Sequence, residues 1–152
     1  MIREASTATD IAIARELFEE YQRALGVDLC FQGFTEELAS LPGAYARPTG
    51  RLLLASSDSL VIGVVALRSL GAADCEMKRL YVRPAGRGLG VGRLLATRLI
   101  DEARLAGYHR MLLDTLATMT GAQALYRSMG FTEIGAYCNN PIEGTLYMAL
   151  KL

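Results

Sequence analysis

The sequence of 152 residues has no tryptophan, one histidine, three cysteines and no net charge, since 16 basic residues balance 16 acidic ones. Disordered chains are poor in apolar residues and rich in charge of one sign, so a 51% hydrophobic, neutral chain is not of that class. The longest apolar run, residues 60–67, is far shorter than the roughly 20 residues that a membrane-spanning helix needs. The length favours a single domain over residues 1–152, which buries enough surface to fold without a metal or disulfides.

The few cysteines and the lone histidine limit the possible chemistry. Cys30, Cys75 and Cys138 are odd in number and contain no Cys-x-x-Cys pair, so neither a disulfide framework nor a zinc site is indicated. We expect reduced, inert thiols, because His109 is the only histidine available for a Cys–His pair. The first ten residues carry acids and hydroxyls where a secretory signal carries bases and an apolar stretch. A cytoplasmic protein with no membrane association is therefore expected.

Charge is unevenly distributed along the neutral chain. Between positions 78 and 110 the only acids are Asp101 and Glu102, and the bases are Lys78, Arg79, Arg83, Arg87, Arg93, Arg98, Arg104 and Arg110. This middle part suits an anionic ligand, although a solvated helix face has the same pattern. The bases fall on one loop and helix without interleaved aromatics, so nucleic-acid binding is not expected.

Hydrophobic periodicity predicts a series of alternating strands and helices. Asp10 is expected to cap a first helix and Gly26 to end it. We expect strands at 2–5, 51–56, 60–70, 75–82, 110–116, 131–137 and 146–150, and helices at 10–25, 34–41, 90–106 and 120–129. This order predicts an α/β (α+β) fold in which helices cover a mixed sheet.

The strand at 75–82 shows a break in its alternation. Leu80 and Val82 share one face, whereas Met77 is out of phase by one residue. An extra residue near Lys78 and Arg79, as in a β-bulge, would restore the phase and splay the neighbouring strands. The alternative is that Met77 lies on the other, also covered, face.

The segment after this strand has the features of an anion site. Pro84 stops the strand, and glycines at 86, 88, 90 and 92 lead into a helix. The first-turn amides of a helix point outward, and glycine lets an anion approach the backbone, while Arg87 and Arg93 add positive charge. The alternative is a glycine-rich turn that only reverses the chain. Known nucleotide loops do not fit, because the chain has no Gly-Lys pair and Arg93 stands where the dinucleotide motif needs glycine.

What does fit is Arg87-x-x-Gly90-x-Gly92, which resembles the pyrophosphate segment of the GNAT superfamily of N-acetyltransferases. The segment Ala124-Leu-Tyr126-Arg-Ser-Met-Gly130-Phe131 resembles the second signature of that family, and the element order matches its fold over nearly the whole chain. The resemblance implies a mostly antiparallel sheet of six or seven strands with helices on both faces, splayed between the fourth and fifth strands. It also implies acetyl-CoA as cosubstrate. A metal is not expected, because the sequence lacks a set of metal ligands.

The resemblance assigns cofactor contacts to two stretches of main chain. The residues that it implies for the pantetheine arm are Leu80, Tyr81 and Val82. Those that it implies for the pyrophosphate are Arg87, Gly88, Leu89, Gly90, Val91, Gly92 and Arg93. The amide of Leu80 is the expected partner of the reaction's oxyanion.

Acetyl transfer to an amine also needs a proton acceptor for the amine and a proton donor for the leaving thiolate. Tyr126 matches the tyrosine that the family places near the cofactor sulfur, and is our candidate donor; a core tyrosine is the alternative. Glu76 begins the central strand where some members place a catalytic glutamate, and Asp74 is a second choice. Glu76 could instead be a strand-end carboxylate paired with Lys78 or Arg79.

The acceptor is expected to be a small, amino-acid-like primary amine. Tyr137, Asn139 and Asn140 could hydrogen-bond it, and Lys78 or Arg79 could bind its carboxylate, although Asn-Asn-Pro is also ordinary turn sequence. The alternatives are acetylation of a protein N-terminus or lysine, and a coenzyme A-binding sensor without turnover. The sequence fits a monomer or a homodimer.

Overall fold

The computed structural model describes residues 1–29 and 33–152, so the prediction for Cys30 lies outside the described residues. The strands are β1 (Ile2–Glu4), β2 (Arg51–Ser57), β3 (Leu60–Ser69), β4 (Asp74–Val82), β5 (Arg110–Thr115), β6 (Thr132–Ile134) and β7 (Leu146–Lys151). The α-helices are α1 (Ala8–Leu25), α2 (Phe34–Ser40), α3 (Val91–Leu105) and α4 (Thr120–Ser128). Short 3₁₀ turns occupy Gly43–Tyr45 and Pro84–Gly86.

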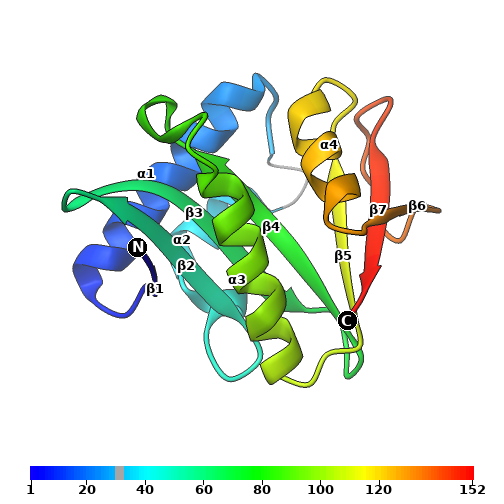
Figure 1. The fold of residues 1–152 in the computed structure, drawn as a ribbon, viewed down its shortest axis with the longest axis horizontal. Coiled ribbons are helices and arrows are strands. Elements are labelled where there is room, and N and C mark those ends of the chain that lie inside the picture. Colours follow the sequence, from blue (N-terminus) through cyan, green and yellow to red (C-terminus); the bar gives the residue numbers. More distant parts are fainter. Residues whose placement is uncertain (30–32) are drawn as a thin grey trace.

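The strands form one sheet in the order β1-β2-β3-β4-β5-β7-β6 (Figure 1). Neighbours pair in the antiparallel sense except β4 and β5, which are parallel. The α/β (α+β) fold and the mostly antiparallel sheet are thereby confirmed. None of the described helices has both the length and the apolar character that crossing a membrane requires.

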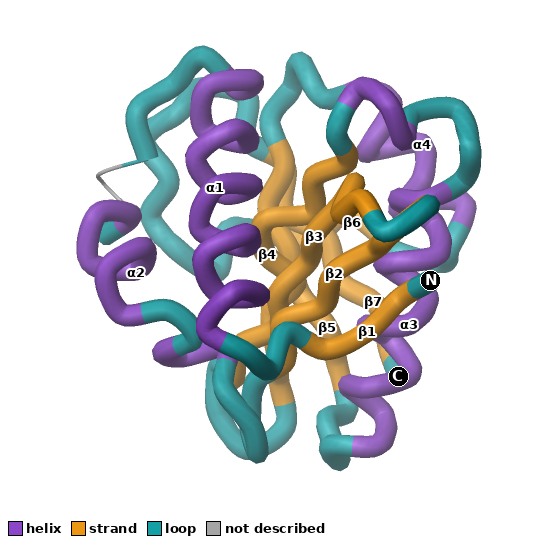
Figure 2. Tube along the Cα trace, turned by 90° about the vertical axis from the view of Figure 1, so that its left-hand side faces the viewer, coloured by secondary structure: helices purple, strands orange, loops and turns teal. Residues whose placement is uncertain are grey.

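The helices lie on both faces of the sheet, with α1 and α2 on one side and α3 and α4 on the other (Figure 2). The side chains of each face form a separate core. One core gathers Leu95 and Leu99 of α3 with Met77, Met111 and other buried residues. The other gathers Leu17 and Phe18 of α1 with residues such as Phe34 and Ala66. Each strand residue therefore belongs to one of two environments.

The first helix begins earlier than predicted. Thr7, not Asp10, is its N-cap, and the Thr7 hydroxyl accepts a hydrogen bond from the Asp10 amide. The Asp10 carboxylate in turn accepts from the amides of Ser6 and Thr7, which completes a capping box. The expectation for Gly26 is confirmed, because this glycine ends the helix in the left-handed region at φ 69°.

The sixth strand is shorter than the predicted 131–137. Only Thr132–Ile134 pairs with β7, and residues 135–145 leave the sheet as a loop. Phe131 precedes the strand and is buried with its ring against Tyr126. Gly135 and the Asn-Asn-Pro turn disfavour a longer ladder, because glycine is weak in strands and proline lacks an amide donor.

The predicted bulge is present in β4. Arg79 has φ 61°, and the β3–β4 register shifts between Val64, opposite Tyr81, and Ala66, opposite Lys78. Met77 consequently lies in the same core as Leu80 and Val82, so the alternative that placed it on the other face is wrong. An extra residue in one strand resets which side chains face each core.

The predicted splay also lies where expected. The parallel ladder of β4 and β5 joins Asp74 to Arg110, Cys75 to Met111 and Glu76 to Leu112, and goes no further. Beyond Glu76 the two strands diverge (Figure 1). The β5-facing edge of β4 from position 77 onward is therefore free to pair with an extended ligand.

Candidate active site

A groove of ≈ 790 Å³ opens beside the diverging end of β4. Its walls come from α1, from the end of β4 with the loop that follows it, from the start of α3, and from α4. Among the lining residues are Leu80, Tyr81, Val82, Arg87, Gly88, Gly90, Val91, Gly92, Arg93 and Tyr126. Most residues assigned to the cofactor by resemblance thus share one surface; Leu89 does not line the groove and is 66% exposed.

The glycine loop presents unpaired amides to this groove. Gly90 caps α3 at φ 76° and supplies no side chain, so the first helical turn is open. Leu94 is the first residue whose amide bonds back, to the Gly90 carbonyl at 3.1 Å. Within the described chain the amides of residues 88–93 have no acceptor. With the helix dipole they form a site that fits a diphosphate.

The two arginines of the loop are partly engaged already. Arg87 donates from Nε to the Val82 carbonyl at 3.1 Å, and its guanidinium lies 6.0 Å from the centre of the Tyr81 ring. Arg93 donates from Nη2 to the Ser128 hydroxyl at 2.7 Å, which ties the start of α3 to the end of α4. Both side chains keep further donors for an anion, because a guanidinium carries five N–H groups.

Tyr126 lies where the groove enters the sheet. It projects from α4, is 6% exposed, and lines both the groove and a narrow cavity of ≈ 40 Å³ between β4 and β5, here called the interstrand cavity. Burial raises the pKa of its phenol, so the hydroxyl keeps its proton at neutral pH. No described residue hydrogen-bonds that hydroxyl. A protonated phenol at this point can donate to a thiolate.

A second space, here called the polar pocket, lies beyond the interstrand cavity. It measures ≈ 160 Å³ and is lined by Arg68, Glu76, Lys78, Asp114, Cys138, Asn139 and Asn140. The sheet register explains the gathering, because Arg68 of β3 lies opposite Glu76 of β4, and Lys78 lies opposite Ala66 on the α1–α2 face. Residues of the 135–145 loop complete the wall.

Glu76 is buried in this wall with both oxygens engaged. It is 1% exposed, and its Oε1 accepts from Arg68 Nε at 2.6 Å while its Oε2 accepts from the Tyr137 hydroxyl at 2.6 Å. Lys78 Nζ lies 4.0 Å from Oε1. Burial, followed by the neighbouring Arg79, lowers the pKa of Lys78, and burial beside Glu76 raises that of Tyr137. Glu76 thus organises three side chains around one carboxylate.

Two other predicted residues are occupied elsewhere. Arg79 lines the interstrand cavity but is buried against α2, where it donates from Nε and Nη2 to Glu37 at 2.9 Å each and lies over the Phe34 ring. Asp74 pairs with Arg110 at 2.9 Å where β4 and β5 begin. Asp74 therefore lies at the wrong end of the splay for the second-choice base.

The loop residues divide into two groups. Asn140 reaches both the interstrand cavity and the polar pocket, and its Nδ2 donates to Asp114 Oδ2 at 3.1 Å. Asn139 is exposed and lines the polar pocket only. Tyr137 acts through Glu76 and packs edge-on against Tyr147 with ring centres 5.4 Å apart. Asn139 and Asn140 therefore line the polar pocket, whereas Tyr137 does not line it and is tied to it through the hydrogen bond to Glu76.

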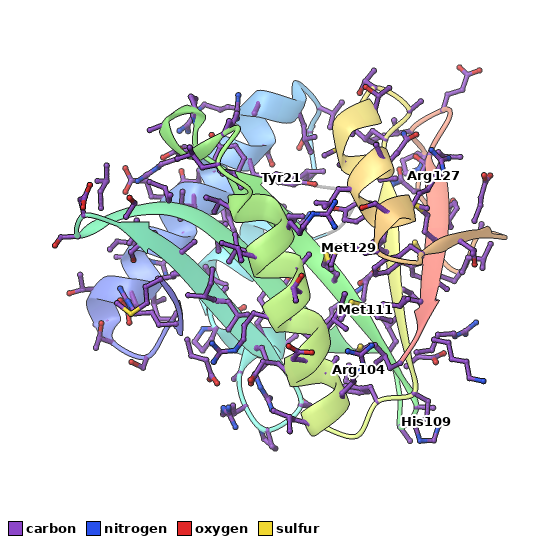
Figure 3. The ribbon with its side chains drawn as sticks, in the orientation of Figure 1. Tyr21, Arg104, His109, Met111, Arg127 and Met129 are labelled. Carbon is purple, nitrogen blue, oxygen red and sulfur yellow. The ribbon has the colours of Figure 1, made fainter. Side chains whose placement is uncertain are left out.

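The two described cysteines differ in their place relative to the site. Cys75 is fully buried outside it, and burial raises the pKa of its thiol to about 12. Cys138 is an exposed residue that lines the polar pocket, where partial desolvation of the thiol and the charge of Asp114 raise its pKa. His109 lies at the opposite end of the sheet from Tyr21 (Figure 3). Among residues 1–29 and 33–152 no cluster of His, Cys, Asp and Glu could hold a metal ion.

Sequence reasoning missed two residues of the polar pocket, Arg68 and Asp114. Asp114 is an acid within the otherwise apolar strand Met111-Leu-Leu-Asp-Thr, and it lines both the interstrand cavity and the polar pocket. That isolated acid was the available signal. Arg68 ends an apolar strand and gave no comparable signal, because its place opposite Glu76 depends on the β3–β4 register.

Relatives of known sequence support the same fold and chemistry. The family model described as "Acetyltransferase (GNAT) family" matches residues 13–131. An uncharacterized N-acetyltransferase of Schizosaccharomyces pombe is 41% identical over 94% of this chain and 89% of its own. A protein named IAA acetyltransferase from Azospirillum brasilense is 36% identical over 84% of this chain and 88% of its own.

Solved structures share the architecture. An acetyltransferase from Streptococcus agalactiae superposes with a TM-score of 0.83 at 20% identity, covering 100% of this chain and 98% of its own. An acetyltransferase from Salmonella typhimurium, solved with acetyl-CoA, has a TM-score of 0.70 at 24% identity, covering 99% and 92%. The chain, with its open amide loop beside a splayed sheet, thus belongs to the GNAT family and is an acetyl-CoA-dependent acetyltransferase.

Proposed function

We propose that residues 1–152 act as one catalytic domain that transfers an acetyl group directly to the primary amine of a small, amino-acid-like acceptor. The observation that carries this proposal is the polar pocket, which neighbours the interstrand cavity beside the cofactor groove and is lined by Arg68 and Lys78. A carboxylate is the ligand that such cations prefer. Acetyl-CoA supplies the activated acetyl group as a thioester.

The chain's own groups divide the remaining work. The amides of residues 88–93 hold the pyrophosphate, and the free edge of β4 at Leu80, Tyr81 and Val82 pairs with the extended arm. Tyr126 donates a proton to the departing sulfur. Among the described residues no cysteine lines the groove or the interstrand cavity, which favours direct transfer over an acyl-enzyme.

The size of the polar pocket favours a small acceptor over a protein substrate. Its ≈ 160 Å³ is below the roughly 300–1,000 Å³ of sites for drug-sized ligands. Of the cations, Arg68 uses its Nε on Glu76, so its Nη groups remain to meet a carboxylate beside Lys78. Arg79, bound to Glu37, is not part of that carboxylate site.

A paired acceptor screen tests this proposal. Each amino acid and its α-amide is incubated with isotope-labelled acetyl-CoA, together with short peptides and a lysine-rich protein, and the products are identified by mass spectrometry. We expect free amino acids to be acetylated, and their amides at least about tenfold less efficiently, since each loses charged hydrogen bonds. Acetylation of peptides or protein lysines alone would contradict the proposal, and binding of acetyl-CoA without any transfer would indicate a sensor.

A further inference from the structure

The three spaces of the site are neighbours, since each shares lining residues with the next. The cofactor groove and the interstrand cavity share Tyr126, Leu80 and Met119 among their walls. The interstrand cavity and the polar pocket share Lys78, Asp114 and Asn140. An amine held in the polar pocket and reacting beside Tyr126 therefore lies close to these last three side chains.

Of the three, Asp114 offers a carboxylate that is partly exposed. Asn140 is an amide without a basic nitrogen, and Lys78 is the group assigned above to the acceptor's carboxylate. Both hydrogen bonds to Asp114 use Oδ2, from Asn140 Nδ2 at 3.1 Å and Cys138 Sγ at 3.9 Å. Within the described residues Oδ1 has no hydrogen-bond partner.

Glu76, the carboxylate expected from the sequence, is less suited to this task. Both of its oxygens accept bonds of 2.6 Å, one from a guanidinium, and it lines the polar pocket but not the interstrand cavity. Both oxygens are thus already occupied by hydrogen bonds, and neither faces the space in which the amine reacts.

We propose that Asp114 is the catalytic base of this enzyme and takes the first proton from the acceptor's ammonium group. The role rests on the proposed transfer to a small amine. Titratable groups from the neighbouring elements surround Asp114: Arg68 from β3, Glu76, Lys78 and Arg79 from β4, Tyr21 from α1, Tyr126 from α4, Tyr147 from β7, and Tyr137 and Cys138 from the 135–145 loop.

The proton balance of the step is as follows. Asp114 Oδ1 takes one proton from the ammonium and later releases it to water. The neutral nitrogen forms a bond to the carbonyl carbon of the thioester, and the carbon–sulfur bond breaks, with the electron pair going to sulfur. Tyr126 gives its proton to that sulfur and regains one from the nitrogen, which is left as an amide nitrogen with a single hydrogen.

Matched carboxamide variants test the assignment. Asp114→Asn and Glu76→Gln are compared with wild type using the amino acid that the screen acetylates fastest, from pH 6 to pH 10, and acetyl-CoA affinity is measured by calorimetry. For Asp114→Asn we expect kcat at pH 7 to fall about 100-fold or more. Its rate should then rise about tenfold per pH unit toward the pKa of the free amine, because only the neutral amine reacts. Acetyl-CoA affinity should stay unchanged, and Glu76→Gln should mainly raise the KM for the acceptor.

A wild-type pH profile in Asp114→Asn, or the steep profile in Glu76→Gln instead, would overturn the assignment. If Asp114→Asn fails to bind acetyl-CoA, Asp114→Glu replaces it in the test. This variant retains a carboxylate, so it should keep the wild-type pH profile at a reduced kcat. A steep pH profile in Asp114→Glu would count against the role. A wild-type protein that binds acetyl-CoA but acetylates no amine would instead refute the proposed function, and this role with it.

Discussion

The cofactor groove and the polar pocket lie on either side of the same splay, yet they are built from different parts of the chain. The groove is bordered by main-chain groups, since it is lined by the glycine loop with its unpaired amides and by the edge of β4. The polar pocket relies on charged side chains from β3, β4, β5 and a loop. Main-chain recognition needs only a local glycine pattern, whereas side-chain recognition depends on which strands meet. Under the proposed function, the groove serves the shared cosubstrate and the pocket selects the acceptor.

Among the variants that compare the groove with the pocket, Tyr126→Phe, at the junction, should show the largest effect. In Tyr126→Phe we expect kcat to fall about 100-fold, because the phenol proton is lost, with acetyl-CoA affinity unchanged by calorimetry. Tyr108→Phe is the matched control, since that buried hydroxyl donates to the Thr49 carbonyl at 2.6 Å away from the site. It should cost about 1 kcal/mol of stability and leave kcat unaltered. Equal kcat in Tyr126→Phe and wild type would remove Tyr126 from the chemistry.

Gly90→Val tests the groove alone. Valine at φ 76° is strained and disturbs the open turn of α3, so we expect acetyl-CoA affinity to fall about tenfold or more. Gly107→Val, with φ 93° and similarly open surroundings, imposes a similar strain at the other end of the same helix. Each variant should lose about 1–2 kcal/mol of stability in urea denaturation. If both weaken acetyl-CoA binding equally, the loop amides are not the determinant.

Arg68→Met tests the polar pocket alone. We expect the KM of the best amino acid to rise about tenfold, with little change for its α-amide, because a charged hydrogen bond to the carboxylate is lost. Arg110→Met is the control, since it breaks the Arg110–Asp74 pair at the far end of the same strands. Steady-state kinetics with both acceptors gives the comparison. A proportional KM rise for the amide would show that Arg68 only supports Glu76.

The same contrast explains what the sequence could predict. The glycine loop, the helix after it and Tyr126 belong to short contiguous motifs, so their positions follow from residues close in the chain. The bulge was also within reach, because Met77 is out of phase with Leu80 by simple alternation. Such features depend on local periodicity and turn chemistry, which the sequence displays directly.

The polar pocket was only partly predictable. Glu76, Lys78 and Asn140 were named from the sequence. The place of Arg68 in the pocket depends on the register between β3 and β4, and that of Asp114 depends on where β5 runs beside β4. Arg79 was expected at the acceptor and instead binds Glu37, a partner 42 positions earlier in the chain. Pairings over such distances are set by tertiary packing and leave no local pattern.

Asp10, remote from both spaces, should show the smallest effect and none on catalysis. The amide of Ser6, together with Arg3, lowers the pKa of its carboxyl from 3.8 to about 2. Because the folded pKa lies below the unfolded one, the stabilisation is complete above about pH 4 and is lost as the pH falls toward 2; we put it at about 1–2 kcal/mol. Asp10→Asn should lose this amount at pH 6 in urea denaturation and converge with wild type near pH 2. The kcat and the acetyl-CoA affinity of this variant should equal those of wild type. The capping box fixes the start of α1, whereas the part of α1 that lines the groove is its end, with Tyr21 and Leu25. Curves that stay parallel down to pH 2 would mean that Asp10 stabilises the helix without its charge.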